Sequence, residues 1–247
     1  MEKIEVLNTR AQIFKHGSVY FDGLATHPGF NCSSGNFDIG DTVAGMELRW
    51  IQMGNILVAD QCLCLGISWD MLNSLGYIFG RQIFIDGRPY LCRSLKVGTE
   101  KTVDSSEWNA LLKIESANTI IHWKNTYSWG QEILKEYPDR RAARGFFMAH
   151  NWTHRDSMCQ DQNMGFRPVL EPLISDLSDI TVGSNMKVYG PHGQTVEGIL
   201  IGFTEYDLTV KAEPSDADLV DWAVRCGEEI IVNRSALVGI GESVNES

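Results

Sequence analysis

The sequence predicts an α+β fold in which a mixed domain is followed by a small β-barrel. Three observations carry this prediction. The pair Asp86-Gly87 separates two apolar segments, a capped helix begins near Asp104, and five short apolar segments follow one another between 184 and 240. Asp-Gly favours the tight turn of a β-hairpin, and short strands joined by tight turns are typical of small barrels.

Composition sets the class of protein. The 247 residues carry 21 basic and 32 acidic side chains, a net charge of −11, and 43% of them are hydrophobic. Such a composition is typical of a globular protein. The acidity argues against binding a long nucleic acid, because phosphates need a basic surface. No apolar segment approaches about 18 residues and the N-terminus lacks an apolar stretch, so we expect no membrane helix, no secretory signal and a cytoplasmic location.

The six cysteines fit the same setting. Only Cys62 and Cys64 are close in sequence, inside an apolar stretch. Alternate residues of a strand share one face, so the pair is interpreted as two small buried side chains, with half of a metal site as the alternative. No second Cys/His pair stands at zinc-ligand spacing. We therefore expect reduced thiols, no metal and no cofactor.

Charge divides the chain into regions. Residues 1–175 hold 17 basic and 19 acidic side chains, whereas residues 176–247 hold 4 and 13, a balance of −9. We place a domain boundary near 175–182, where a proline and polar residues interrupt an apolar run. The predicted parts are an N-terminal β segment (1–54) packed on the main domain, the main mixed domain (55–175) and the barrel (182–247).

The expected elements follow in chain order. Residues 46–50 alternate as on a half-buried strand, and 56–67 form a more continuously apolar candidate for a central strand. Residues 68–76 predict a short helix with Ser68 as N-cap and Gly76 at its end. Segments 81–85 and 88–92 predict the hairpin. The next helix is capped by Asp104 or Ser105 and buries an apolar stripe that includes Trp108.

Residues 117–167 show no sustained period. They are rich in aromatic residues, Arg, Asn, Gly and His. Because so many aromatic side chains would not remain solvated, we expect an ordered surface built from loops rather than a disordered segment. Beyond the boundary, strands are predicted at 185–190, 194–204, 207–212, 228–233 and 235–240. Turns are expected at 191–193 and 205–206, and a loop or short helix at 213–221.

Two motifs in the main domain carry a family resemblance. Residues 141–146 (RAARGF) are followed about twenty residues later by 165–170 (GFRPVL), and Trp123 and 128–132 (SWGQE) precede them. This arrangement resembles the end of the C-type-lectin-like fold shared by formylglycine-generating-enzyme-like domains and the variable proteins of phage diversity-generating elements. The resemblance covers roughly 80–170. It implies a surface loop between the motifs and a phage-associated protein, in the cytoplasm of a bacterial host.

A second resemblance concerns the C-terminal region. Residues 187–203 and 232–240 resemble the two motifs of an Sm-like barrel over about 55 residues. SH3-like and Sm-like barrels share the predicted strand pattern. The resemblance implies an assembly module that joins neighbouring subunits through edge strands, so we expect a homo-oligomer.

The first resemblance also raises the question of an enzyme. Formylglycine-generating chemistry needs two cysteine thiolates for copper(I), which prefers soft ligands. Residues 145–152 (GFFMAHNW) contain no cysteine, and Cys159 stands alone after them. Two histidines at 150 and 154 and two aspartates at 156 and 161 are interpreted as loop residues rather than a metal or acid–base pair. We therefore expect no catalytic activity, with an altered enzyme on the same fold as an alternative.

The residues expected to bind a ligand lie in and before the second motif. Residues 140–167 hold five arginines against two aspartates, a local charge of +3. Arginine donates paired hydrogen bonds to phosphate, and aromatic rings stack on flat ligands. Arg144 and Arg167 have a structural alternative, in which they bond loop carbonyls. The predicted ligand-binding residues are Tyr127, Trp129, Arg141, Arg144, Phe147, His150, Trp152, His154, Arg155 and Arg167.

Three functions are compatible with these observations. The first is sequestration of a small anionic, nucleotide-like ligand, such as an immune signal of the host. The second is a protein-recognition or receptor-binding module that uses the same loops. The third is the altered enzyme. A deep pocket lined by arginine and aromatic residues favours the first, and a broad exposed patch favours the second.

Overall fold

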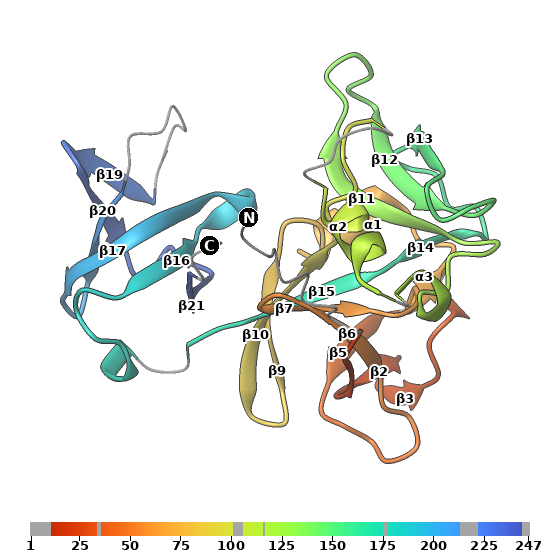
Figure 1. The fold of residues 1–247 in the computed structure, drawn as a ribbon, viewed down its shortest axis with the longest axis horizontal. Helices are drawn as coiled ribbons and strands as arrows, with labels where there is room; N and C mark the ends of the chain where they lie inside the picture. The colour runs from red at the N-terminus through yellow and green to blue at the C-terminus, as the bar shows by residue number, and fades with distance from the viewer. Residues whose placement is uncertain are drawn as a thin grey trace, which may run out of the picture.

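The protein is mostly β, with four open sheets and a few short helices in the part of the chain that the structure describes (Figure 1). The computed structural model describes residues 11–33, 36–100, 106–115, 117–174, 177–212 and 222–243. The α-helices are α1 (Trp69–Ser74), α2 (Glu107–Lys113) and α3 (Ala117–Ile120). None of the helices in these ranges is long and apolar enough to cross a membrane.

Three sheets form the body of the molecule. A small sheet has the order β3-β2-β5. The first large sheet has the order β1-β6-β7-β15-β10-β9, and the second has the order β13-β12-β11-β14-β8-β4. In chain order, their strands are β1 (Ile13–Lys15), β2 (Ser18–Phe21), β3 (Leu24–Thr26), β4 (Phe30–Asn31), β5 (Phe37–Gly40), β6 (Arg49–Met53), β7 (Ile56–Ala59), β8 (Cys64–Leu65), β9 (Arg81–Ile85), β10 (Arg88–Ser94), β11 (Tyr127–Ile133), β12 (Arg140–Gly145), β13 (Trp152–Asp156), β14 (Met164–Phe166) and β15 (Pro168–Pro172).

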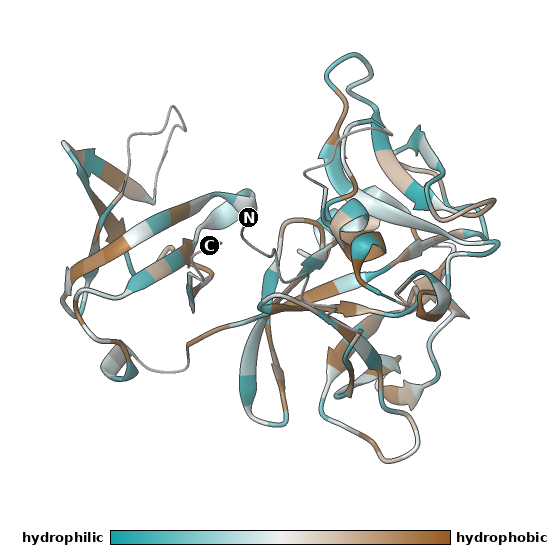
Figure 2. Ribbon diagram, viewed as in Figure 1, coloured by the Kyte–Doolittle hydropathy of each residue, from teal (hydrophilic) through white to brown (hydrophobic). Residues whose placement is uncertain are grey.

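The fourth sheet is C-terminal and open. Its order is β19-β20-β18-β17-β16-β21. Strand β17 buries Val196 and Leu200 between more exposed residues, and hydrophobic and hydrophilic residues follow one another along it (Figure 2). The strands are β16 (Asn185–Tyr189), β17 (Thr195–Phe203), β18 (Asp207–Lys211), β19 (Ala223–Cys226), β20 (Glu229–Asn233) and β21 (Gly239–Glu242).

The predicted small barrel over 182–247 does not form among the described residues, whose strands make an open sheet. Strand β19, which the sequence analysis did not expect, ends the sheet on one side. On the other side of the sheet, the N–H of Ile174 donates to the carbonyl of Ile240 at 2.7 Å. Strand β21 therefore lies against the body and does not pair with β19, as it would in a barrel. The last strand begins at Gly239 rather than at 235, because Asn233 and Ser235 form a turn. The predicted loop at 213–221 lies outside the described residues.

The predicted hairpin and first helix are confirmed. Asp86 and Gly87 have φ values of 50° and 76°, the left-handed pair that a type I′ turn requires. Ser68 caps α1 by accepting a hydrogen bond from the N–H of Met71 at 3.2 Å. Gly76 has a φ of 81°, as expected of a glycine just beyond a helix.

The second helix begins slightly later than predicted. Ser106 is its N-cap and accepts a hydrogen bond from the N–H of Asn109. Asp104 and Ser105, which were the predicted caps, lie outside the described residues. The apolar stripe is confirmed, since Trp108 and Leu111 are fully buried.

Two expectations about the body are wrong. Segment 56–67 contains two strands of different sheets, because the chain turns between Ala59 and Cys64. Segment 117–167 is not mainly loop: β11, β12 and β13 form an antiparallel ladder through its centre. The sequence did not predict these strands, because charged residues such as Arg141 and Arg144 occupy strand positions where a periodic pattern would have apolar ones.

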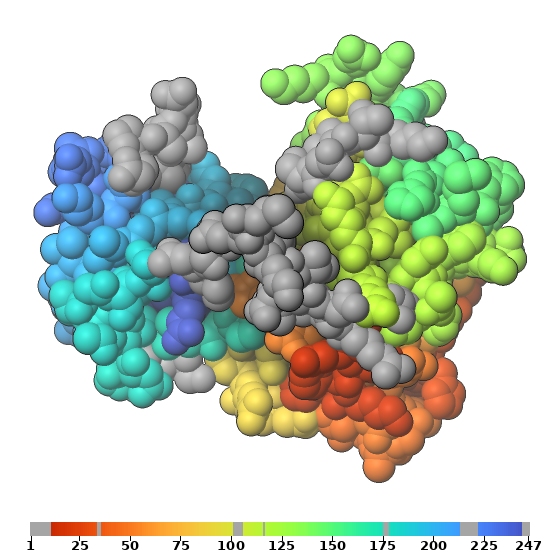
Figure 3. Space-filling view, in the orientation of Figure 1, coloured from red at the N-terminus to blue at the C-terminus, as the bar shows by residue number. Residues whose placement is uncertain are grey.

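The C-terminal sheet has its own apolar core and stands beside the body, with a notch along one side in the space-filling view (Figure 3). Leu91 and Leu173 of the body pack with Tyr189 of β16, and Val238 lies against them. This contact holds the two parts next to each other.

Candidate functional site

The β12–β13 ladder divides the predicted ligand-binding residues between two faces. Arg144 lies opposite Trp152, and Ala142 lies opposite His154. Arg141 lies opposite Arg155. Because neighbouring residues of a strand point to opposite faces, Arg144, Trp152 and His154 share one face and Arg141 and Arg155 share the other. The arginines therefore do not converge on one pocket.

Arg167 is fully buried and braces the body. Its guanidinium donates to Ser128 Oγ at 3.0 Å and to the carbonyls of Ala59 and His122, both at 2.8 Å. Burial lowers the pKa of Arg167, since the low-dielectric interior disfavours the charge. These bonds use the side chain structurally, as the alternative interpretation expected.

Three more of the predicted residues lie in the interior. Arg144 donates to the carbonyls of Val97, His150 and Glu100. The indole N–H of Trp129 donates to the carbonyl of Ile67 at 2.8 Å. The exposed fractions are 0% for Trp129 and Arg144 and 4% for Tyr127. None of the three offers an open face to a ligand.

One exposed group of side chains lies on the same face of the sheet as Trp152, and we call it the His154 cluster. The ring of Tyr137 stacks on His154 at 5.4 Å, and Trp152 meets His154 edge-on at 5.6 Å. Arg140 Nη1 lies 3.1 Å from His154 Nδ1. Desolvation and the neighbouring Arg140 and Arg155 lower the pKa of His154, so its ring is neutral at pH 7 and accepts from Arg140.

The other exposed group is built on residues 145–151, which we call the Phe147 loop. Phe146 stacks on Tyr127 with a centroid distance of 4.8 Å, and Phe147 meets Phe146 edge-on at 4.6 Å. The guanidinium of Arg155 lies 5.5 Å from the Tyr127 ring. Phe147, Arg155 and Tyr127 thus belong to one continuous stack, which ends in solvent at Phe147.

Hydrogen bonds fix the shape of the Phe147 loop. The N–H of Gly145 donates to the carbonyl of Asn151, and Asn151 Nδ2 donates back to the carbonyl of Gly145 at 2.8 Å. Trp108 donates from its indole to the carbonyl of Ala149 at 2.8 Å. Phe146 has a φ of 78°, a strained conformation for an aromatic residue that is often found at functional sites.

The fixed loop holds two large apolar side chains in solvent. Phe147 is 73% exposed and Met148 is 55% exposed. His150 is also exposed on this loop. The sequence predicted Phe147 and His150 as ligand-binding residues, but not Met148, Phe146 or the cluster partner Tyr137. The run Phe-Phe-Met inside a polar stretch was the available signal.

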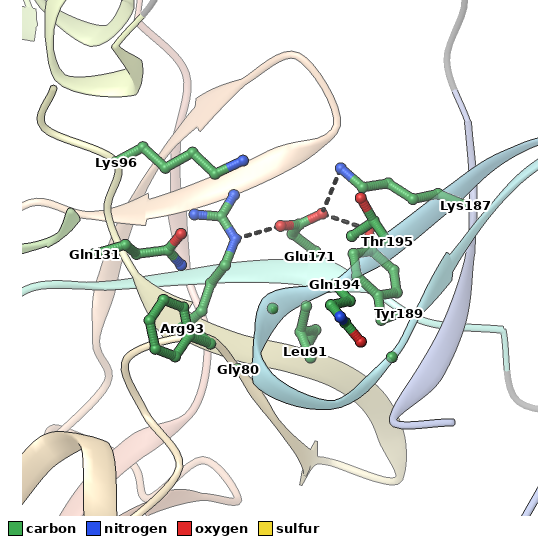
Figure 4. A pocket seen from close by; sticks show the side chains of 13 residues that line it. Gly80, Leu91, Arg93, Lys96, Gln131, Glu171, Lys187, Tyr189, Gln194 and Thr195 are labelled. Carbon is green, nitrogen blue, oxygen red and sulfur yellow. Dashed lines mark hydrogen bonds and ion pairs between the residues drawn. The ribbon is translucent and has the colours of Figure 1, made fainter. Parts of the chain in front are cut away.

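A small hollow lies between the body and the C-terminal sheet (Figure 4). Arg93 is buried and binds Glu107 and Glu171, while Glu171 also accepts from the hydroxyl of Tyr189. Lys187 Nζ lies 3.9 Å from Glu171. The free space is about 30 Å³, enough for a water molecule but not for a nucleotide. This charge network therefore ties two parts of the chain together and is not the ligand site.

The residues considered for chemistry do not assemble. Among the described residues, no group of three or more His, Cys, Asp or Glu side chains could hold a metal ion. Cys62 is buried, with its Sγ 3.4 Å from Ser128 Oγ. Asp156 accepts from the N–H of Met158 at 2.9 Å, which is a turn contact.

Comparisons with known proteins found no matching family model, no similar curated protein and no similar solved structure.

Proposed function

We propose that this chain is a non-enzymatic binding protein whose Phe147 loop anchors a macromolecular partner. The carrying observation is the exposure of Phe147 and Met148 on a loop whose backbone is held by hydrogen bonds. Partner residues are often recognised by loops on a rigid scaffold, and aromatic anchors dominate binding energy. The C-type-lectin-like architecture expected for the body remains part of this proposal, supported by the GFRPVL segment, which forms β14 and β15.

The expected contribution of the loop follows from area. An aromatic side chain buries roughly 150–250 Å² when covered, and apolar area contributes about 25 cal/mol per Å². Since Phe147 is 73% exposed, covering it supplies about 3 kcal/mol of transfer free energy, which sets an upper bound on its contribution to binding. That value is in the range of interface hot spots, for which substitution by alanine costs about 2–4 kcal/mol.

The test compares matched variants in quantitative affinity purification from a bacterial lysate. A double variant, Phe147→Ser with Met148→Ser, removes both apolar tips. The control is Met158→Ser, because Met158 is 74% exposed but lies outside the loop. We expect partner recovery to fall at least about tenfold for the double variant only. Equal recovery by the wild type and the double variant would contradict the proposal.

Arg155 favours a second candidate, binding of a small anionic, nucleotide-like ligand. Its Nη1 donates to Thr153 Oγ1 and to the carbonyl of His154, whereas Nε and Nη2 have no hydrogen-bond partner among the described residues. A guanidinium with free donors, in a stack of side chains that ends at the exposed Phe147 ring, suits an anion that carries a flat ring. Native mass spectrometry of the protein from lysate, before and after denaturation, tests this candidate. A small molecule released intact from wild type but absent from Arg155→Ala would establish it.

A further inference from the structure

A groove of about 620 Å³ lies against the small sheet β3-β2-β5. Such a volume is within the usual range of small-molecule sites, about 300–1,000 Å³. One wall belongs to β2 and β5, and the other to the junction of α1 and β9. The lining side chains are Tyr20, Asn36, Asp38, Asp41, Leu75 and Arg81.

Tyr20 supplies an aromatic surface with a fixed position. It lies directly opposite Asp38 in the β2–β5 pairing, so both side chains stand on the same face of the sheet. The Tyr20 hydroxyl donates to the carbonyl of Asp41 at 2.9 Å. A Cβ atom at Gly40 would lie 3.4 Å from the Tyr20 ring, which shows how closely the ring covers this strand.

Asp38 and Arg81 form an oriented polar pair in the same groove. Tyr77, which is fully buried, donates from its hydroxyl to Asp38 Oδ1 at 2.7 Å. Arg81 Nη2 lies 3.6 Å from the same oxygen, and its guanidinium lies 4.9 Å from the Tyr77 ring. Burial raises the pKa of Tyr77, so its hydroxyl remains a donor at neutral pH. Tyr77 and Arg81 thus fix Asp38 through Oδ1, whereas Oδ2 has no hydrogen-bond partner among the described residues.

The charges in the groove are largely satisfied within the protein. Asp38 is paired with Arg81, and Asp41 Oδ1 accepts from the N–H of Asp86 at 2.6 Å. An anionic ligand would meet two carboxylates, and a cationic ligand would compete with Arg81 for Asp38 and with the N–H of Asp86 for Asp41. A neutral ligand avoids both penalties while it uses the free carboxylate oxygen as acceptor and the guanidinium as donor.

We infer that this groove binds a neutral carbohydrate. Neighbouring hydroxyl groups of a sugar both donate and accept, which matches the adjacent carboxylate and guanidinium. The C–H face of a pyranose ring is apolar and packs on an aromatic ring such as that of Tyr20. A fixed aromatic surface beside an oriented donor–acceptor pair therefore matches both faces of a sugar ring. This site is separate from the Phe147 loop.

The test uses the purified full-length protein on an array of neutral and acidic oligosaccharides. The strongest neutral binder is then titrated, as the free oligosaccharide, against variants in a calorimeter. Asp38→Asn and Tyr20→Ala should each weaken binding at least about tenfold, the loss expected when one hydrogen bond to a charged group or one stacked ring is removed. Leu24→Ala is the matched control, because Leu24 is 75% exposed on the neighbouring strand and does not line the groove.

Several outcomes would overturn the inference. Retention of no neutral oligosaccharide at a protein concentration of about 100 μM would do so, as would retention of acidic ones only. So would equal affinity of the wild type, Tyr20→Ala and Asp38→Asn. If Asp38→Asn lowers the melting temperature because Tyr77 loses part of its hydrogen bond, Tyr20→Ala decides. The Phe147→Ser, Met148→Ser double variant should bind the oligosaccharide like the wild type.

Discussion

Replacing Arg167 by methionine tests whether this buried guanidinium holds the body together. The substitution keeps an unbranched side chain in the core but removes every donor. It leaves the carbonyls of Ala59 and His122 without the bonds, both 2.8 Å long, that they now accept. An unsatisfied buried acceptor costs about 1–3 kcal/mol. Ser128 Oγ keeps its contact with Cys62 Sγ at 3.4 Å, so losing the bond from Arg167 costs less at Ser128 than at the two carbonyls.

Relief of a buried charge offsets part of that cost. Burial lowers the pKa of Arg167, which shows that the interior disfavours the charged form. Two carbonyls nevertheless lose their donor, at about 1–3 kcal/mol each, and losses at neighbouring groups do not simply add. We therefore expect Arg167→Met to lower the free energy of unfolding by about 2–5 kcal/mol.

Urea unfolding followed by tryptophan fluorescence measures this difference. Arg155→Met is the matched control, because among the described residues the hydrogen bonds of Arg155 go only to Thr153 and His154 of its own strand. We expect the control to lose less than about 1 kcal/mol. Arg167→Lys should fall between the wild type and Arg167→Met, since an ammonium lacks the planar fork that reaches three separate acceptors. A loss below about 1 kcal/mol for Arg167→Met would refute the bracing role.

Three further predictions concern other parts of the molecule. Burial alone would raise the pKa of Glu171, but Arg93, Lys187 and the Tyr189 hydroxyl outweigh burial and lower this pKa. The ionised Glu171 therefore stabilises the fold at pH values above its usual pKa, and this stability is lost as the pH falls through the lowered pKa. Unfolding measured between pH 5 and 3 should show a shallower acid dependence for Glu171→Gln than for the wild type. Gly145 has a φ of 106°, and a Cβ atom there would lie 2.6 Å from the carbonyl oxygen of Thr126; Gly145→Ala should destabilise by about 2–4 kcal/mol in thermal unfolding, whereas Gly202→Ala, with open space around it, should cost less than about 1 kcal/mol. We also predict a homo-oligomer that uses the outer face of the C-terminal sheet, where Val224 is 64% exposed and lies opposite Ile231. Light scattering should give a mass above 27.7 kDa for the wild type and the monomer mass for Val224→Glu. A monomeric wild type at micromolar concentration would contradict this prediction.

Local signals in the sequence were sufficient for elements that local chemistry determines. Asp86-Gly87 specified its hairpin because only a few residue pairs adopt two consecutive positive φ values. Ser68 specified the start of α1 because its hydroxyl satisfies a free N–H. The order of strands was not accessible, since β7 pairs with β15 across more than a hundred residues, and periodicity contains no information on such distant partners.

The candidate site shows the same limit. The local excess of arginine was real, but composition does not indicate whether a guanidinium faces solvent or a carbonyl. Arg144 and Arg167 donate their hydrogen bonds to backbone oxygens of distant segments, and only the folded chain shows this. The prediction that Trp152 and His154 lie in a loop was wrong, because both belong to β13, which pairs with β12. The side chains of β13 are mostly polar and show no strand periodicity that would have predicted this pairing.

Strand alternation also determines what one ligand can touch. Arg155 and the Phe147 loop meet through Tyr127, because Phe146 stacks on that ring and Arg155 lies over it. The His154 cluster stands on the opposite face, and β13 is the edge strand of its sheet. A partner held by Phe147 reaches the cluster only by passing around that edge. Effects of Phe147→Ala and Arg155→Ala on binding should therefore be coupled in a double-mutant cycle. Those of Phe147→Ala and Tyr137→Ala should add within about 0.5 kcal/mol, since the two residues share no contact. Strong coupling between Phe147 and Tyr137 would mean that the partner wraps the edge of the sheet and binds both faces.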